Sequence, residues 1–436
     1  MSPTELYYDP YDYSIDDDPY PVWARLRDEA PLYHNEKLDF YALSRYDDVL
    51  DGLLDSETFV SSHGITMEMI SDEPLGVPMM IMMDPPQHTR LRKLVSRAFT
   101  PMRVAQLEPR IRQVCADLLD PLADQKGFDL IHDFAGLLPP TVILALLGFP
   151  TDIAKEWRKE VDAAIHLEEG STGEGASMRY GTDIVSRTGE LGSVVFDMLP
   201  GLIEERRKDP QDDMLSGLVH AEVDDEEGEH RTLTDAEIYS FIQLLSIAGS
   251  ETVVRLLGFA TVTLNEFPDQ REILVNEPEW IPNAVEETLR FEAPSPIQGR
   301  WVAQDIELHG TVVPRGSKMA LLNGSADRDP RHFPDADRYD VKREIDRHLA
   351  FGYGTHFCIG GALARLEGRV ALDELLKRYP TWDVDEARVE KIHTSTVRGY
   401  TSVPVISCHI CRPAPRGSFS IRHVVSSISV ARVRAS

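Results

Sequence analysis

Cysteine is scarce in this chain, with four among 436 residues. Four cysteines are too few for a disulfide framework, and they favour a reducing, cytoplasmic setting. The first 20 residues carry several acids but no lysine or arginine, which argues against a signal peptide or a membrane anchor. The longest apolar stretch, 134–149, is interrupted by Pro139 and Pro140 and is shorter than a membrane span requires. We therefore expect a buried helix at that stretch.

Positive charge is also scarce. The 45 lysines and arginines are outnumbered by 73 acids, which gives a net charge of −28 at pH 7 and disfavours nucleic acid or an anionic membrane as a partner. Residues 408–436 are an exception, because they contain five arginines and no acid or lysine. They are rich in serine and lack a helical apolar period, so we expect a disordered basic tail outside the fold.

The sequence also lacks an internal repeat and a Pro- or Gly-rich linker, so we expect 1–407 to form a single domain. Helical patterning dominates 87–291 and returns at 359–379, whereas 296–324 has the alternation and turns of strands. Residues 325–350 are irregular and polar, as surface loops usually are. This distribution predicts a mainly α fold with a small β-rich region.

Among the few cysteines, Cys358 stands out. Residues 351–360 place it between glycines, directly before an apolar helical repeat. This pattern predicts a thiolate at a helix N-terminus, where the helix dipole and free backbone N–H groups lower the thiol pKa. Such a thiolate suits a soft metal ligand. A buried structural cysteine in a glycine-rich turn is the alternative that these residues leave open.

A long helix is predicted over 234–265, opened by a capping box. In its middle, Gly249, Glu251 and Thr252 interrupt an apolar run. A glycine costs about 1 kcal/mol relative to alanine in a helix, and a buried carboxylate costs more, so stability alone does not explain the set. A flat group could lie against the Gly249 backbone. The alternative is a Thr-lined kink in which Glu251 pairs with Arg255.

Two further charged motifs lie on predicted helices. Glu287 and Arg290 are spaced i, i+3, and His88 and Arg92 are spaced i, i+4, so each pair shares one helix face. Taken alone, each motif is common on exposed helix faces. The fork of an arginine also suits a carboxylate, so the second motif could instead bind a ligand that carries carboxylates.

Taken in order along 19–406, these motifs resemble those of the cytochrome P-450 monooxygenases of the soluble bacterial type. A Pro-Tyr-Pro start and the sequence Asp-Arg-Tyr at 337–339 belong to the same pattern. The resemblance implies the triangular, mainly helical fold of that family, with haem b as cofactor and Cys358 as the iron ligand. It also implies that Thr252 and Glu251 deliver protons to bound dioxygen, although the family more often has aspartate where this chain has Glu251.

The same resemblance assigns residues around the haem. The residues expected to contact the haem or its propionates are His88, Arg92, Gly249, Arg300, Phe351, His356 and Gly360. The residues expected to form a buried charged scaffold behind the cysteine loop are Glu287, Arg290 and Arg338. Removing one member of such a buried network costs roughly 3–5 kcal/mol, so its expected role is structural and supports haem incorporation.

The expected substrate is a hydrophobic small molecule, such as a steroid, a terpenoid, a fatty acid or a polyketide. Residues 61–83 contain six methionines, whose flexible thioethers suit either core filling or a wall that accepts a variable apolar ligand. Residues 167–175 are rich in glutamate and glycine and are expected to form a mobile connection. The stretch 167–177 is expected to lie near the pocket wall. The predicted pocket residues are Met67, Ile70, Met79, Leu244, Ala248 and Ile297.

The sequence has no glycine fingerprint for a flavin or a nicotinamide, so a ferredoxin and its NAD(P)H-dependent reductase are the expected electron donors. A local basic patch near the cysteine loop is the expected docking surface for the ferredoxin. The residues of this patch are Arg90, Lys93, Arg97, Arg347 and Arg365.

Other functions remain open at this point. The haem could serve oxidative coupling or a peroxygenase reaction, and a non-catalytic protein that binds haem or a hydrophobic ligand is the alternative from another class. Cys408 and Cys411 form an isolated Cys-x-x-Cys without a second pair or a following helix, so we expect no metal or redox role for them.

Overall fold

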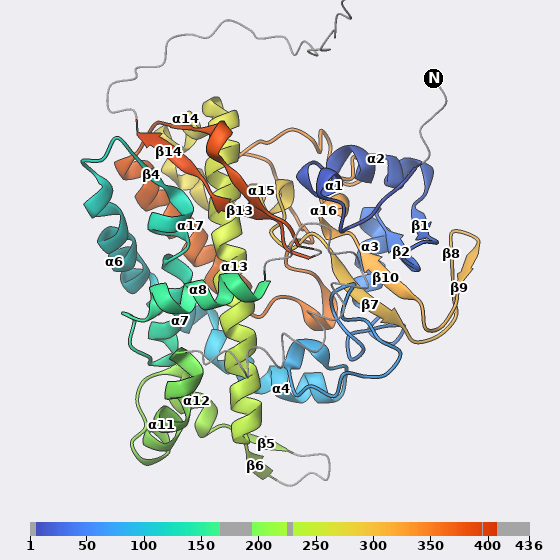
Figure 1. Ribbon diagram of the computed structural model, residues 1–436, viewed down its shortest axis with the longest axis horizontal. Helices are drawn as coiled ribbons and strands as arrows, with labels where there is room; N and C mark the ends of the chain where they lie inside the picture. Colours follow the sequence, from blue (N-terminus) through green and yellow to red (C-terminus); the bar gives the residue numbers. More distant parts are fainter. Residues whose placement is uncertain (1–5, 166–193, 225–229, 395, 408–436) are drawn as a thin grey trace, which may run out of the picture.

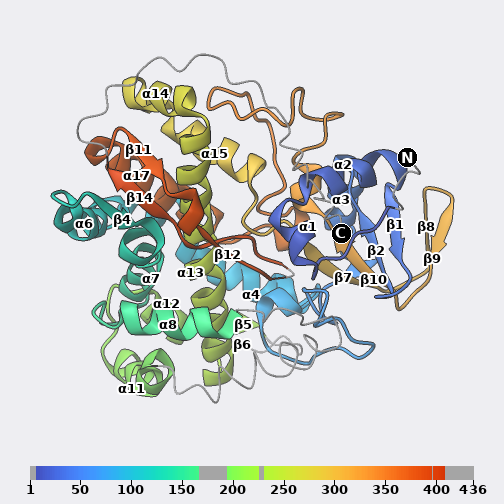
Figure 2. The same cartoon turned by 45° about the horizontal axis from the view of Figure 1, so that its top comes forward.

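The computed structural model describes residues 6–165, 194–224, 230–394 and 396–407. A helical part and a smaller β-rich part lie on opposite sides of the long helix α13, Asp235–Glu266 (Figure 1). A view turned by 45° keeps the same division, with α6 and α17 on one side of α13 and β1, β2, β8 and β9 on the other (Figure 2). The predicted mainly α fold with a small β-rich region is confirmed.

The described α-helices are α1 (Tyr13–Asp17), α2 (Tyr20–Glu29), α3 (Tyr46–Leu54), α4 (Gln87–Val95), α5 (Pro101–Gln106), α6 (Glu108–Leu119), α7 (Leu138–Leu147), α8 (Ala154–Ile165), α11 (Val194–Lys208), α12 (Met214–Val219), α13, α14 (Pro268–Asn276), α15 (Ile281–Phe291), α16 (Asn323–Ala326) and α17 (Gly361–Arg378). The described strands are β1 (Leu32–Asn35), β2 (Phe40–Leu43), β3 (Phe59–Val60), β4 (Gly127–Asp129), β5 (Glu222–Asp224), β6 (His230–Thr232), β7 (Gln298–Val302), β8 (Ile306–Leu308), β9 (Thr311–Val313), β10 (Lys318–Leu321), β11 (Trp382–Val384), β12 (Glu390–Ile392), β13 (Gly399–Ser402) and β14 (Pro404–Ser407).

The main sheet has five strands in the order β1-β2-β10-β7-β3. Strands β2 and β10 run parallel, and the other neighbours in this sheet are antiparallel. The start of β7 is tied to the methionine-rich loop, because the N–H of Gly299 donates to the carbonyl of Ile65 at 2.8 Å. The next residue, Arg300, lies opposite Met319 of β10 and is buried. The sheet therefore brings a buried arginine and the methionine-rich loop together.

Helix α13 is the central element of the fold. Its N-terminus is fixed by the predicted capping box, in which Thr234 and Glu237 satisfy each other's backbone N–H groups. At 1.5 Å per residue its 32 residues span about 48 Å. It packs against α7, α15 and α17, and most of its side chains are buried, so residues in its middle lie at the centre of the molecule.

Two helical stretches, Leu130–Leu147 and Asp235–Glu266, are long and apolar enough by composition to cross a membrane. They are 67% and 72% buried inside the fold, which is the arrangement of core helices. Pro139 and Pro140 lie in the first turn of α7, where a missing N–H breaks no helical hydrogen bond. The buried helix predicted for 134–149 is thus observed, with its α-helical part starting at Leu138.

The segment 325–350 differs from its prediction as a polar surface loop. It is irregular, but Asp327, Asp329 and Tyr339 in it are each at most 1% exposed. Most of their polar groups have partners inside the protein, for instance Oδ1 of Asp327, which accepts a hydrogen bond from the N–H of Leu349 at 2.7 Å. Three further predictions lie outside the described residues. They concern 167–177, Cys408 with Cys411, and the basic tail 408–436.

Candidate active site

The cysteine loop gets its shape from two glycines. Gly352 and Gly354 have φ of +65° and +66°, a left-handed conformation that favours glycine. A Cβ on Gly354 would also lie 2.7 Å from the carbonyl oxygen of Leu53 in α3. The loop then turns back, and the N–H of Cys358 donates to the carbonyl of Phe351 at 2.9 Å. Cys358 is thereby held just before the first turn of α17.

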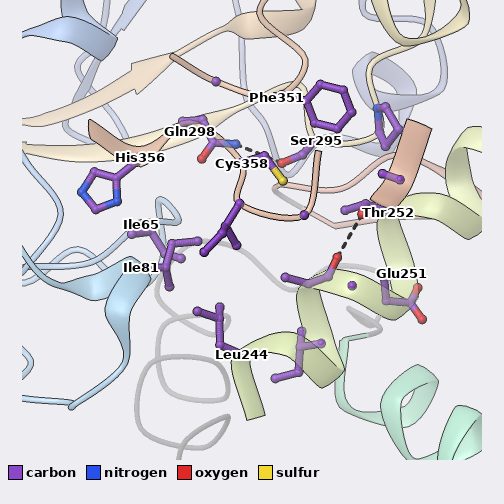
Figure 3. Close-up of a pocket in the computed structure, with 18 of the residues that line it drawn as sticks. Ile65, Ile81, Leu244, Glu251, Thr252, Ser295, Gln298, Phe351, His356 and Cys358 are labelled. Carbon is purple, nitrogen blue, oxygen red and sulfur yellow. Dashed lines mark hydrogen bonds between the residues drawn. The ribbon is translucent and has the colours of Figure 1, made fainter. Parts of the chain in front are cut away.

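The sulfur of Cys358 faces a large cavity (Figure 3). Burial raises the pKa of its thiol, and the N–H groups of Gly360 and Gly361 with Arg92 and Arg365 act in the opposite direction. The prediction of a thiol pKa below its ordinary value is therefore wrong, because desolvation outweighs the helix N-terminus. A bound metal ion would favour the thiolate form of this cysteine.

Four cationic or potentially cationic side chains gather beside the cysteine loop. They are His88, Arg92, Arg300 and His356, all of which line the cavity. The rings of His88 and His356 lie 4.3 Å apart. Burial and the neighbouring positive charges lower the pKa of His356 to about 2, and burial with Arg92 lowers that of His88 to about 4. Burial also lowers the pKa of Arg300 to about 10.

This cluster has the character of an anion site. Within the described part of the chain, Nδ1 of His88 and Nε2 of His356 are buried without a hydrogen-bond partner. The nearby carboxylate of Asp84 is bonded to the N–H groups of Ser61 and Ser62 at 2.8 and 3.1 Å. A ligand with carboxylates would satisfy the orphaned nitrogens and neutralise the arginines. Haem b, with two propionates and an iron that takes a thiolate, fits this set.

Helix α13 forms the wall opposite the cysteine loop. The hydroxyl of Thr252 donates to the carbonyl of Ala248 at 2.9 Å, as expected for a threonine that bonds back along a helix. Gly249 lines the cavity, but a Cβ on it would lie 2.7 Å from Cδ1 of Ile143 in α7. An added side chain would therefore meet α7, while Gly249 itself stays at the cavity wall, and its contact with a flat ligand remains a prediction.

Glu251 is 2% exposed and forms an ion pair with Arg255, one turn further along α13. Its other carboxylate oxygen lies 3.6 Å from Nη2 of Arg158 in α8. Figure 3 shows the carboxylate directed away from Cys358. The structure thus contains the pair with Arg255 that was the alternative interpretation of this stretch, and it places the hydroxyl of Thr252, rather than the carboxylate of Glu251, toward the cysteine loop.

The scaffold behind the cysteine loop differs from the prediction in one member. Both oxygens of Glu287 bind Arg290, at 2.7 and 2.9 Å, and both residues are fully buried. The third cation is Arg343, whose Nε lies 3.2 Å from Glu287. The side chain of Arg338 is 65% exposed and lies 3.8 Å from Asp340, so the assignment of Arg338 as the third member is wrong. Arg338 contributes only its backbone carbonyl.

The predicted pocket residues fall into two groups. Met79, Leu244 and Ala248 line the cavity. Met67, Ile70 and Ile297 are not among the described residues that line it, and they pack around Trp23 and Phe40 under the main sheet. Their assignment to the pocket is therefore wrong. Within the methionine-rich loop, the described residues that line the cavity are Ile65, Thr66, Glu68, Met69, Met79, Met80, Ile81 and Met82.

Several cavity residues had no signal in the sequence. Ser295 precedes β7 and Gln298 is its first residue, and a hydrogen bond of 3.0 Å joins the two. Thr394 and Val397 come from the connection between β12 and β13. Glu367 of α17 also lines the cavity, and its Oε2 is buried without a hydrogen-bond partner in the described part of the chain. These residues are distant in sequence, and only the fold brings them together.

Comparison with known proteins gives one consistent result. The family model described as Cytochrome P450 matches residues 39–404. The chain is 40% identical over 404 residues to the putative cytochrome P450 123 of Mycobacterium tuberculosis, which covers 92% of this chain and 97% of that protein. It is 36% identical over 403 residues to the 6-deoxyerythronolide B hydroxylase of Saccharopolyspora erythraea, covering 88% and 95%. The solved structure of CYP109E1 from Bacillus megaterium in complex with testosterone is similar with a TM-score of 0.77 and 29% identity, over 89% of this chain and 98% of that chain.

The site agrees with these matches, since a thiol just before α17, two arginines with two histidines as donors, and an apolar cavity are what a haem-thiolate protein requires. The chain therefore belongs to the cytochrome P450 family and is a monooxygenase whose cofactor is haem b.

Proposed function

We propose that this enzyme inserts an oxygen atom into a C–H or C=C bond of a hydrophobic small molecule, with Cys358 as the iron ligand and Thr252 as the residue that orders proton delivery. The observation that carries the proposal is that the Cys358 sulfur and the Thr252 side chain line the same apolar cavity from opposite walls (Figure 3). Haem b held in this cavity would supply dioxygen activation, with Cys358 as its thiolate ligand.

The remaining work is done by the chain itself. His88, Arg92, Arg300 and His356 would hold the propionates and so orient the ring. The Thr252 hydroxyl gives its hydrogen to Ala248, which leaves its oxygen lone pairs to hold a proton donor at the cavity wall. Glu251 lies next to it on α13, held by two arginines, and in our proposal it accepts protons from water and passes them toward Thr252.

The cavity favours an apolar substrate. Its wall away from the cysteine loop is formed by thioethers and aliphatic side chains, among them Met69, Met79, Ile81 and Leu244, which adapt to ligands of variable shape. Steroid, terpenoid, fatty acid and polyketide compounds all meet this requirement. One relative is named a 6-deoxyerythronolide B hydroxylase, and one similar structure was solved in complex with testosterone. A panel of these classes, scored by the spectral shift that each causes in the haem, identifies the class.

The proposed electron donor is a ferredoxin in the cytoplasm, reduced by an NAD(P)H-dependent reductase. Lys93 is exposed on α4, next to Arg92, whose guanidinium bonds the carbonyl of Phe357 in the cysteine loop. Arg90 and Arg347 are partly exposed, and the Arg97 side chain lies outside the described residues. Lys93→Glu should slow ferredoxin-dependent reduction at low salt, whereas Lys126→Glu, between α6 and β4, should not. Equal rates of ferredoxin-dependent reduction in the two variants would show that the ferredoxin does not dock at Lys93.

The monooxygenase reaction is tested by the ratio of product formed to NAD(P)H consumed, with a surrogate ferredoxin system. Thr252→Ala should lower this ratio several-fold and raise peroxide release, because the ordered proton donor is lost. Thr261→Ala is the matched control: its hydroxyl makes the same helical bond, to Leu257 at 2.9 Å, but it is not among the described residues that line the cavity. Turnover with peroxide alone, unaffected by Thr252→Ala, would instead favour a peroxygenase.

A further inference from the structure

A charged cluster beside the scaffold is not used by the mechanism above. Nε and Nη2 of Arg365 in α17 donate to the two oxygens of Glu286 in α15 at 2.7 and 2.9 Å. Nε2 of His348 lies 3.0 Å from Oε2 of the same carboxylate. Burial raises the pKa of Glu286, but the hydrogen bonds from His348 and Arg365 outweigh it and lower that pKa to about 2. The three side chains form one unit, which we call the Glu286 cluster.

The Glu286 cluster packs against Phe351, the first residue of the cysteine loop. The guanidinium carbon of Arg365 lies 4.4 Å from the centre of the Phe351 ring, and the ring of His348 lies 5.8 Å away. A Cβ on Gly361 would lie 3.4 Å from Nη1 of Arg365 and 3.7 Å from Cδ1 of Phe351. The guanidinium and the ring therefore meet directly over the first turn of α17, beside Cys358.

The ion pair itself contributes little to folding. The side chains of Arg365 and Glu286 are 37% and 26% exposed, and partly exposed pairs have small net energies because water competes for both charges. The positive charge of Arg365 nevertheless reaches the sulfur, since it acts against burial on the pKa of Cys358. A planar guanidinium held by a bidentate carboxylate also has a fixed orientation over the ring.

We infer that Glu286 and Arg365 are positioning residues for the iron ligand: Arg365 holds Phe351, whose carbonyl accepts the Cys358 N–H, and places a positive charge beside the sulfur. This inference rests on the proposed ligation of iron by Cys358. Groups that fix and charge the surroundings of a ligand tune the metal as well as hold it, so the cluster is expected to set the reduction potential of the haem and to preserve its thiolate ligation.

Because Arg365 and Glu286 carry opposite charges, neutralising each should shift the reduction potential of the haem in the opposite direction. Arg365→Gln removes a positive charge near the thiolate and should lower the reduction potential of the haem. Glu286→Gln leaves Arg365 charged without its counter-ion and should raise it. Both variants should lose the red-shifted reduced-CO band of thiolate ligation several-fold faster than the unmodified enzyme, because Phe351 is less firmly held. Arg365→Lys keeps the charge but not the planar fork, and should recover most of the potential but not the persistence of the band.

Arg369 provides a matched control on the same helix. It lies one turn beyond Arg365, is 42% exposed and pairs with Glu108 at 2.8 Å. Arg369→Gln should leave both the potential and the band unchanged. The inference would be overturned if Arg365→Gln and Glu286→Gln shifted the reduction potential in the same direction. It would also be overturned if Arg369→Gln shifted the potential as much as they do, because the effect would then be a nonspecific loss of structure. Failure of the proposed ligation is distinguishable, because the unmodified enzyme would then lack the thiolate band from the start.

Discussion

Nε of Arg343 lies 3.2 Å from Oε1 of Glu287, a carboxylate that is already bonded through both oxygens to Arg290. Arg343 also donates to the backbone carbonyls of Pro334, Asp335 and Arg338 at 2.6, 2.9 and 2.9 Å. Arg290 in turn holds the carbonyls of Asp327 and Ala336, both at 2.9 Å. One buried carboxylate thereby orients two arginines that tie the irregular segment 325–350 to α15.

Arg343→Ala should be strongly destabilising. It removes one member of a buried ionic network together with three hydrogen bonds to carbonyls, so we expect a loss of about 3 kcal/mol in the free energy of unfolding. Arg338→Ala should cost less than about 0.5 kcal/mol, because its side chain is largely exposed. Denaturant unfolding of the two variants measures both values. Equal losses would show that the side chain of Arg338 does belong to the network.

Arg300→Gln should stabilise the haem-free protein but weaken the binding of haem. In the haem-free protein it removes a buried charge, whose burial lowers the pKa of Arg300, so the unfolding midpoint should rise. In the loaded enzyme it removes a charge-assisted hydrogen bond worth about 1.5–3 kcal/mol, so haem should transfer to an acceptor protein roughly 10- to 100-fold faster. Arg315→Gln, an exposed arginine after β9, should change neither quantity. A slower transfer would argue against a propionate contact at Arg300.

Glu367→Gln should change how stability depends on pH. Burial raises the pKa of Glu367 from 4.5 to about 8. Between these values the folded protein keeps a proton that the unfolded chain releases, so the free energy of unfolding falls as pH rises, by at most ~1.4 kcal/mol per pH unit. Glutamine carries no such proton. The stability of the variant relative to that of the unmodified enzyme should therefore increase as the pH is raised from 5 to 8, as measured by thermal unfolding.

Glu374, two turns further along α17, is the control for this effect. Burial raises its pKa, but hydrogen bonds from Arg378 and Arg112 outweigh burial and lower it. A group whose pKa is lowered on folding stabilises the protein above its unfolded pKa, and this stabilisation is lost as the pH falls. Glu374→Gln should therefore be less stable than the unmodified enzyme at pH 8. The same pH response in the two variants would show that Glu367 is not a buried, unpaired acid.

Sequence patterns could predict the elements whose signals are local. The capping box at Thr234 and the glycines around Cys358 each determine a local conformation, and both features are present in the structure. The errors concern which partner a side chain meets. Arg338 and Arg343 are both arginines in one irregular segment, and no period indicates which of them turns inward. Met67 and Met69 differ only in the direction that the loop gives them. Such choices depend on packing between segments hundreds of residues apart.

Cys358→Ala should abolish the red-shifted reduced-CO band while Cys115→Ala preserves it. Cys115 is the other cysteine in the described part of the chain, lies fully buried in α6, and has its thiol pKa raised to about 12 by burial and nearby acids. It therefore has neither the access nor the thiolate character of a ligand. Cys115→Ala should cost some stability, because it leaves a small void in the core, but its spectrum should match that of the unmodified enzyme. Haem retained by Cys358→Ala through the propionate donors should give a blue-shifted band. A red-shifted band in that variant would mean that the iron ligand is another residue.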